Sequence, residues 1–171
     1  KYSESLSLNE DADDAWGEAN CLDRLAAIYL EQYENEQAAT CGDRAIEIFR
    51  ELGDTRGEAG ALLIRGVVHS REDDREKATE ILEKALTLFS NMGDKAGQAN
   101  CFYEMAFVYF DGGDLEQADL FFNKALKGYK ETGLRQNQAD ALSSLGRICL
   151  DRNRFEGARN LFNESISICK E

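Results

Sequence analysis

Residues 97–126 read GQANCFYEMAFVYFDGGDLEQADLFFNKAL, and this stretch decides the fold. Apolar residues recur in it at steps of three and four on both sides of the triplet Gly112-Gly113-Asp114. Such steps place side chains on one face of an α-helix. The stretch therefore predicts two amphipathic helices joined by a glycine turn. The apolar positions are Ala99, Phe102, Met105, Ala106 and Tyr109 before the triplet, and Ala118, Phe121, Phe122, Ala125 and Leu126 after it.

The same pattern recurs every 40 residues without a gap, which indicates a repeat array. The matched columns include Ala19, Ala59, Ala99 and Ala139; Leu22, Leu62, Phe102 and Leu142; Ala38, Ala78, Ala118 and Ala158; and Glu36, Glu76, Glu116 and Glu156. A helical hairpin of this size cannot bury its apolar face alone, so neighbouring hairpins must stack. A column of small residues is expected where adjacent hairpins approach closely. Its members are Ala26, Gly66, Ala106 and Gly146.

The period predicts an all-α fold, a solenoid of antiparallel helical hairpins in a single domain over residues 1–171. The expected divisions are the end of a preceding repeat at 1–12 and repeats at 13–52, 53–92, 93–132 and 133–171. First helices are expected near residues 15–31, 55–71, 95–111 and 135–151, and second helices near 35–51, 75–91, 115–131 and 155–171. Because Tyr2, Ser5, Leu6 and Leu8 fit the columns of a second helix, the chain is expected to be a fragment of a longer protein.

Glycine and aspartate mark the expected helix ends. Gly53-Asp54 and Gly93-Asp94 supply a glycine able to end one helix in the left-handed conformation, followed by an acid able to cap the next helix. Asp114, with Gln117 three residues later, resembles a capping box.

Composition excludes several classes of function. The chain has 171 residues, of which 43% are hydrophobic and 31% charged, as in an ordinary globular protein. No apolar run approaches the ~20 residues that a membrane-spanning helix needs. The formal net charge of −13, from 33 acidic and 20 basic residues, argues against nucleic acid and anionic membrane surfaces as partners and favours a basic partner.

The cysteines and the single histidine predict no metal site and no cofactor. An odd count of five cysteines, without a C-x-x-C pair, indicates reduced thiols and a cytoplasmic protein. Cys41 and Cys169 occupy columns that otherwise hold large apolar residues, so both are expected in the core. His69 shares a column with Tyr29 and Tyr109 and is likewise expected to be a core residue. Neither a nucleophile–base pair nor a phosphate-binding loop is recognisable, so the chain is expected not to be an enzyme.

These columns resemble the tetratricopeptide repeat. The third repeat carries the resemblance as Phe102, Met105-Ala106, Tyr109, Ala118, Phe122 and Ala125. The usual repeat has ~34 residues, and the longer form here resembles the arrays of Leu-Gly-Asn or Pins adaptors, of rapsyn and of kinesin light chains. The resemblance implies a right-handed superhelix whose first helices line a concave groove for a peptide or a partner helix.

The resemblance also implies which residues would line that groove. A carboxylate clamp of the chaperone-binding type is not expected, because the matching positions hold Asp23, Ala27, Leu63 and Val67. The groove is instead expected to be apolar and aromatic with acidic flanks, which suits a basic and partly apolar segment. Leu30 is expected to point inward. The expected partner-binding residues are Asn20, Asp23, Glu31, Leu63, Val67, Arg71, Asn100, Tyr103, Phe107, Phe110, Asp111, Asp140, Arg147 and Leu150.

The sequence is compatible with three functions. The first is a non-enzymatic adaptor or scaffold that binds another protein in the groove. The second is a regulatory array that senses a peptide, as in the peptide-pheromone sensors of bacteria. The third is end-to-end self-association through uncapped apolar ends. A further interpretation keeps Phe107 and Phe110 as ordinary core residues that touch only the neighbouring second helix.

Overall fold

The structure is a computed structural model that describes residues 14–170, and within them every regular element is an α-helix. The expected ranges of the first helices are confirmed to the residue, and those of the second helices differ by one residue at most. The expected end of a preceding repeat, at residues 1–12, lies outside the described residues. The helices are α2 (Ala15–Glu31), α3 (Asn35–Leu52), α4 (Thr55–Arg71), α5 (Arg75–Asn91), α6 (Lys95–Asp111), α7 (Leu115–Thr132), α8 (Arg135–Asp151) and α9 (Phe155–Lys170).

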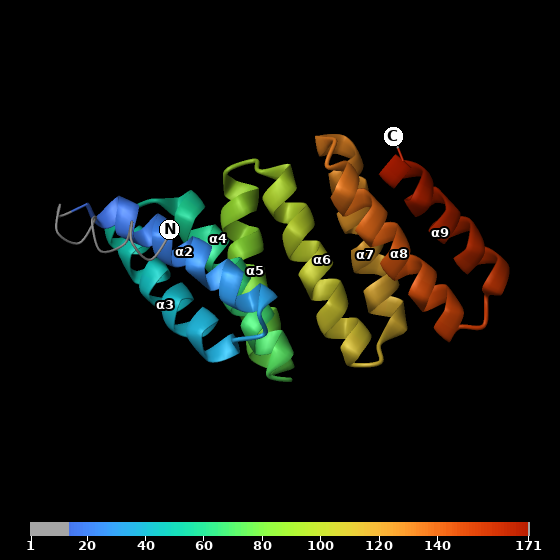
Figure 1. Ribbon diagram of the computed structural model, residues 1–171, viewed down its shortest axis with the longest axis horizontal. Helices are drawn as coiled ribbons and strands as arrows, with labels where there is room; N and C mark the ends of the chain where they lie inside the picture. Colours follow the sequence, from blue (N-terminus) through green and yellow to red (C-terminus); the bar gives the residue numbers. More distant parts are fainter. Residues whose placement is uncertain (1–13, 171) are drawn as a thin grey trace. The chain divides into compact units, whose positions relative to one another are not determined.

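The helices form two compact units, Lys1–Met92 and Gly93–Glu171. The first unit holds the hairpins α2/α3 and α4/α5, and the second holds α6/α7 and α8/α9, with the helices of each hairpin antiparallel (Figure 1). Inside the first unit α3 packs on α4, and inside the second unit α7 packs on α8. The division of the chain into four repeats of one domain stays a prediction.

Aspartate side chains begin most of the helices. Asp14, Asp54, Asp74, Asp94 and Asp114 each accept a hydrogen bond from a backbone N–H in the first turn of the following helix. Such bonds satisfy donors that have no partner inside the helix. At Asp114 only one half of the expected capping box forms, because its own N–H donates to the carbonyl of Tyr109 at 2.9 Å.

Left-handed residues end the helices. The turn inside each hairpin contains one residue with positive φ. Each turn that connects one hairpin to the next also contains one, and there it is always glycine. Tyr33, Asp73 and Asn153 adopt φ near +60°, a conformation that non-glycine residues rarely adopt. The left-handed glycines are Gly53, Gly93, Gly113 and Gly133.

The column of small residues lies between the two helices of one hairpin, which corrects the expectation that it marks the close approach of adjacent hairpins. A Cβ placed on Gly66 would lie 2.6 Å from Leu82, and one on Gly146 would lie 2.9 Å from Phe162, in both cases on the partner helix of the same hairpin. The expectation is wrong because a large residue on the second helix reaches across its own hairpin and occupies the space above the small residue.

Neighbouring hairpins approach closely elsewhere. In the first unit a Cβ on Gly57, at the start of α4, would lie 2.3 Å from the ring of Phe49 on α3. Glycine is therefore needed at this position for the two hairpins to stack.

The core residues follow the alanine columns. In the second unit one buried cluster joins Ala118, Phe122 and Tyr129 of α7 to Leu142 and Ile148 of α8. His69 is largely buried, with its Nδ1 3.4 Å from Glu72 Oε2. Cys169 is exposed, so its expected place in the core is wrong. It lies on α9, the last described helix, which packs mainly against α8.

Candidate partner-binding surfaces

Half-buried aromatic rings of α6 form the most distinctive surface of the second unit. The Tyr103 ring meets the Phe107 ring edge-on at 5.0 Å between centroids. Both rings also meet the buried ring of Phe122 on α7 edge-on, at 5.4 Å and 5.1 Å. Such geometry is favourable between aromatic side chains. The α6 rings therefore rest on the core while part of each remains accessible.

The interpretation of Phe107 and Phe110 as ordinary core residues describes only part of this geometry. Both pack against the buried cluster, but neither is fully buried. The guanidinium of Arg147, on α8, lies 4.9 Å from the centre of the Phe110 ring, within the range of a cation–π contact. Leu150, further along α8, is 42% exposed.

Polar groups from three helices lie beside these rings. The Tyr129 hydroxyl, from α7, donates to Asn100 Oδ1 on α6 at 3.0 Å. Burial raises the pKa of Tyr129 and that of Tyr103, and a hydrogen bond with Ser144 on α8 partly offsets the second shift. Both phenols therefore stay neutral at physiological pH and serve as hydrogen-bonding groups.

The acidic residues expected on this surface remain accessible. Asp140 accepts a hydrogen bond from Gln136 Nε2, one turn earlier on α8, at 3.2 Å. Asp111 is exposed at the end of α6. The second unit thus places Asn100, Tyr103, Phe107, Phe110 and Asp111 on α6, and Asp140, Arg147 and Leu150 on α8.

The first unit places the remaining expected residues on α2 and α4. Asn20, Asp23 and Glu31 lie on α2, and Leu63, Val67 and Arg71 lie on α4. Leu30 is buried against Val68 rather than lining a groove, which corrects one expectation.

Two of these side chains form hydrogen bonds to backbone carbonyls within the first unit. Arg71 donates to the carbonyl of Leu30 and lies 5.1 Å from the centre of the exposed Tyr33 ring. Asn20 donates to the carbonyl of Trp16 at 2.8 Å. Arg71 therefore caps the end of α2 and holds the adjoining turn, a role that competes with partner binding.

The carboxyl of Asp23 has a different environment. Its Oδ1 atom is buried and has no hydrogen-bond partner. Burial raises the pKa of Asp23, and the positive charge of Arg24 opposes the rise. Buried acceptors are nearly always paired in folded proteins.

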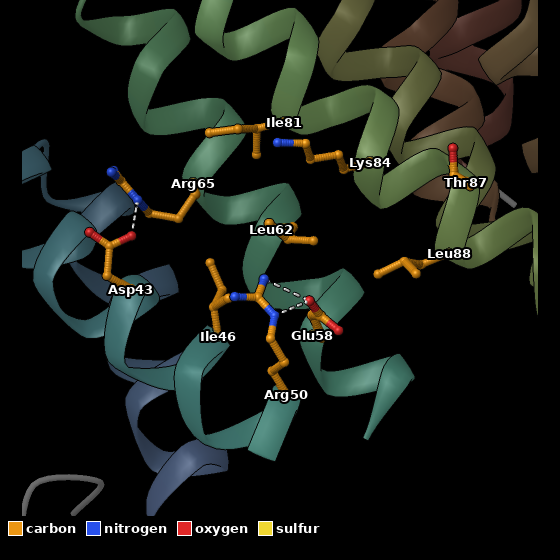
Figure 2. Close-up of a pocket in the computed structure, with 10 residues that line it drawn as sticks. All are labelled: Asp43, Ile46, Arg50, Glu58, Leu62, Arg65, Ile81, Lys84, Thr87 and Leu88. Carbon is orange, nitrogen blue, oxygen red and sulfur yellow. Dashed lines mark hydrogen bonds and ion pairs between the residues drawn. The ribbon is translucent and has the colours of Figure 1, made fainter. Parts of the chain in front are cut away.

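A pocket that the sequence did not predict lies between α3, α4 and α5 (Figure 2). It has a volume of about 480 Å³. Ion pairs stand at its rim, Arg50 with Glu58 at 2.8 Å and Arg65 with Asp43 at 2.6 Å. Its lining residues are Asp43, Ile46, Arg50, Glu58, Leu62, Arg65, Ile81, Lys84, Thr87 and Leu88.

Two departures from the repeat pattern accompany this pocket. Arg65 stands in a column that holds Leu25, Met105 and Leu145, and Gly42 stands where other repeats have a large apolar residue. A Cβ on Gly42 would lie 3.1 Å from Arg65 Cδ, so the glycine makes room for the arginine stem. A glycine in place of a large apolar residue at position 42, combined with an arginine in place of an apolar residue at position 65, is the signal in the sequence that could have indicated the pocket.

The structure shows neither a membrane span nor a metal site within residues 14–170. None of these helices combines the length and apolar character needed to cross a bilayer. His, Cys, Asp and Glu side chains do not gather in threes around a common metal position there.

Stacked antiparallel hairpins with small residues at fixed positions define a helical repeat protein of the solenoid class. Profiles of the tetratricopeptide repeat match residues 57–131, 97–171 and 19–52. The chain therefore belongs to the tetratricopeptide repeat family, whose arrays are protein–protein interaction modules and typically not enzymes. A search of curated proteins found no match.

Solved structures share the fold at low sequence identity. A Rap protein complexed with Competence and Sporulation Factor matches with a TM-score of 0.92 and 19% identity, over 99% of this chain and 47% of that one. BtubC (BKLC) from P. vanneervenii matches with a TM-score of 0.78 and 18% identity, over 98% of this chain and 70% of that one. A putative kinesin light chain from Podosopora anserina matches with a TM-score of 0.66 and 14% identity, over 98% of this chain and 86% of that one. The chain thus spans about half the length of the Rap protein.

Proposed function

We propose that the chain is a non-enzymatic interaction module that binds a peptide or a helix of a partner protein on the first helices of its hairpins. The observation that carries the proposal is the pair Tyr103 and Phe107, two aromatic rings that are fixed on the core at Phe122 yet remain partly accessible. Rigid, partly exposed aromatic residues are enriched among the residues that dominate binding energy.

The chemistry of the surface suggests the chemistry of the partner. The rings and Leu150 offer apolar anchoring, and the acidic residues Asp111 and Asp140 lie on the same two helices, α6 and α8. With a net charge of −13, the chain would attract a basic segment over long range. The expected partner therefore combines apolar anchors with lysine or arginine.

A random-peptide selection followed by calorimetry tests this proposal. Peptides retained by the wild-type chain would be titrated into a Tyr103→Ala/Phe107→Ala variant and into a Leu120→Ala control. Leu120 is an exposed apolar residue of the second helix α7. Loss of binding in the double variant alone, with helicity retained in both, would support the proposal. Equal binding by all three proteins would contradict it.

A peptide-sensing regulatory array is the second candidate. It is favoured by the similarity in fold to a Rap protein that was solved with Competence and Sporulation Factor bound. In this case binding would also change the conformation of the chain. Small-angle X-ray scattering with and without a selected peptide would separate the two functions, since a simple adaptor would keep its radius of gyration. End-to-end self-association stays a prediction, which sedimentation over a range of concentrations would test.

A further inference from the structure

We propose that the pocket between α3, α4 and α5 binds a small amphipathic carboxylate, a compound with one carboxylate group on a hydrocarbon body. The carboxylate would lie between Arg50 and Lys84, and the hydrocarbon body would cover the apolar floor of the pocket. The site lies entirely within the first unit and does not involve Tyr103 or Phe107. It is therefore a second binding site, beyond the proposed binding of a partner protein.

Two like charges line the pocket where the second unit has an ion pair. The matching positions, two repeats further along the chain, hold Lys130 on α7 and Glu164 on α9, whose side chains pair at 3.3 Å. In the first unit these positions hold Arg50 on α3 and Lys84 on α5, which are both cations. An anion between them would take the part that Glu164 plays in the second unit.

The two arginines of the pocket keep donors for such an anion. Glu58 Oε1 accepts from Nε of Arg50 at 2.9 Å and contacts its Nη2 at 2.8 Å, and Nη1 is turned away from Glu58 (Figure 2). Asp43 Oδ1 accepts from Nε of Arg65 at 2.6 Å. This contact uses Nε alone, so the Nη groups of Arg65 can donate to a further acceptor.

The charges of the pocket suit a single carboxylate. Its lining includes three basic and two acidic side chains, an excess of one positive charge in a chain whose net charge is −13. Lys84 contacts Glu80 on its own helix at 2.6 Å, but both side chains are exposed, and such pairs are weak. An acidic protein segment with several negative charges would be repelled by the rest of the chain more strongly than a monoanion.

The floor and the size of the pocket suit a hydrocarbon body. Ile46 and Leu62 are buried, and Ile81 and Leu88 are half-buried around them. Leu62 lies between Arg50 and Lys84 in the view of Figure 2. The volume of about 480 Å³ falls within the range of about 300 to 1,000 Å³ that is typical of small-molecule sites. A ligand that fits this site therefore joins an apolar body to one negative charge.

A change at two packed positions brings Arg65 to this wall of the pocket. In the second unit the matching positions hold Phe122 and Leu145, which are buried in one core cluster. The first unit has Gly42 and Arg65 there, and a Cβ on Gly42 would lie 3.1 Å from Arg65 Cδ. The arginine stem thus packs where the repeat otherwise has a large apolar side chain, and its cation lines the pocket.

Calorimetric titration with three probes of equal chain length tests the site. Octanoate, neutral octanol and cationic octylamine would each be titrated into the wild-type chain and into Lys84→Glu, which places an acid opposite Arg50 as in the second unit. Lys77→Glu is the matched control, because Lys77 is an exposed lysine of α5 outside the pocket lining. Gly42→Phe/Arg65→Leu restores the pair of the second unit and provides a variant that removes the arginine.

The site predicts a preference for the anion that depends on Lys84. Octanoate should bind the wild type and Lys77→Glu alike, and about 10- to 100-fold more tightly than octanol or octylamine, as expected for hydrogen bonds between charged groups. Lys84→Glu should weaken octanoate by a similar factor and change octanol little. Gly42→Phe/Arg65→Leu should likewise lose octanoate binding, and its thermal melt would show whether it remains folded.

Several outcomes would overturn the site. These are equal affinity of the wild type for octanoate and octanol, an equal loss in Lys77→Glu and Lys84→Glu, or no octanoate binding up to millimolar concentration. Binding of hexaglutamate in preference to octanoate would indicate an acidic protein segment and overturn the class of ligand. The Tyr103→Ala/Phe107→Ala variant should bind octanoate like wild type, so the fate of this site and that of the proposed function are measured separately.

Discussion

Trp16 and Asp54 link the starts of two neighbouring first helices. The indole N–H of Trp16 donates to Asp54 Oδ2 at 3.1 Å, while Asp54 Oδ1 accepts the N–H groups of Arg56 and Gly57 at 3.1 Å and 3.0 Å. One carboxylate thus caps α4 and holds the beginning of α2. Trp16 is the only tryptophan of the chain, so its fluorescence reports on the first unit.

Replacing Asp54 with alanine should destabilise the first unit by about 1 to 2 kcal/mol, the usual loss for an N-cap. Urea unfolding followed by tryptophan fluorescence would measure the change. The emission of the folded protein should also shift, because the indole loses its partner. Asp114→Ala is the matched control, since it removes a cap from α7 without touching Trp16. An Asp54→Ala variant with unchanged unfolding and emission would disprove the link.

Ala118 tests the packing of the hairpin α6/α7. Its side chain is completely buried in the core cluster of the second unit. Leucine at this position should overpack the hairpin and cost about 1 to 3 kcal/mol. Thermal unfolding followed by circular dichroism would show a lower midpoint. Ala27→Leu, at an exposed position of α2, is the control and should change the midpoint little. Equal midpoints for both variants would mean that the repeat register is wrong.

Asp23→Asn should stabilise the folded chain at neutral pH. A neutral amide would replace a buried carboxylate that has no hydrogen-bond partner, and an unpaired charge is costly to bury. The pKa of Asp23 is raised by burial, with Arg24 opposing the rise. Because the pKa is raised in the folded state, Asp23 contributes most to the stability of the wild type below the ordinary aspartate pKa. This contribution is lost as the pH rises through the folded-state pKa.

The difference between wild type and Asp23→Asn in free energy of unfolding should therefore be small at acidic pH and larger at neutral pH. Urea midpoints of both proteins across this range would measure it. A difference that shrinks as pH rises would contradict the assigned direction.

The cysteines should differ widely in reactivity. Burial, with a smaller contribution from the charge of Glu104, raises the pKa of Cys101 to about 12, whereas Cys169 is exposed. Because the thiolate is the reactive form, iodoacetamide at mildly alkaline pH should label Cys169 rapidly and Cys101 hardly at all. Mass spectrometry of the peptides would measure the rates, and labelling in urea provides the reference. Comparable rates in the folded chain would contradict the burial of Cys101.

The sequence predicts most of the fold because each helix end depends on a few adjacent residues. Gly53 adopts φ of 69° and Asp54 caps the next helix, as the pair suggested. The placement of single side chains is less predictable, because it depends on contacts between helices. Leu30 is buried by Val68, and Arg71 turns back to the carbonyl of Leu30.

The pocket beside Arg65 was missed for a related reason. A repeat pattern records what the repeats share, whereas this pocket accompanies a difference at Gly42 and Arg65 in one region. The rings of Tyr103 and Phe107 were expected on an accessible face because aromatic residues stand out in their columns, and both rings are partly accessible. Their role in binding stays a prediction, which the double variant described below tests.

The most direct test of the central claim is calorimetric titration of a selected peptide into wild type and into the Tyr103→Ala/Phe107→Ala variant. If the first helices bind the partner, affinity should fall by at least about tenfold, the equivalent of about 1.4 kcal/mol. The variant should retain its helical circular dichroism. Unchanged affinity in a folded variant would contradict the claim and direct attention to the pocket between α3, α4 and α5.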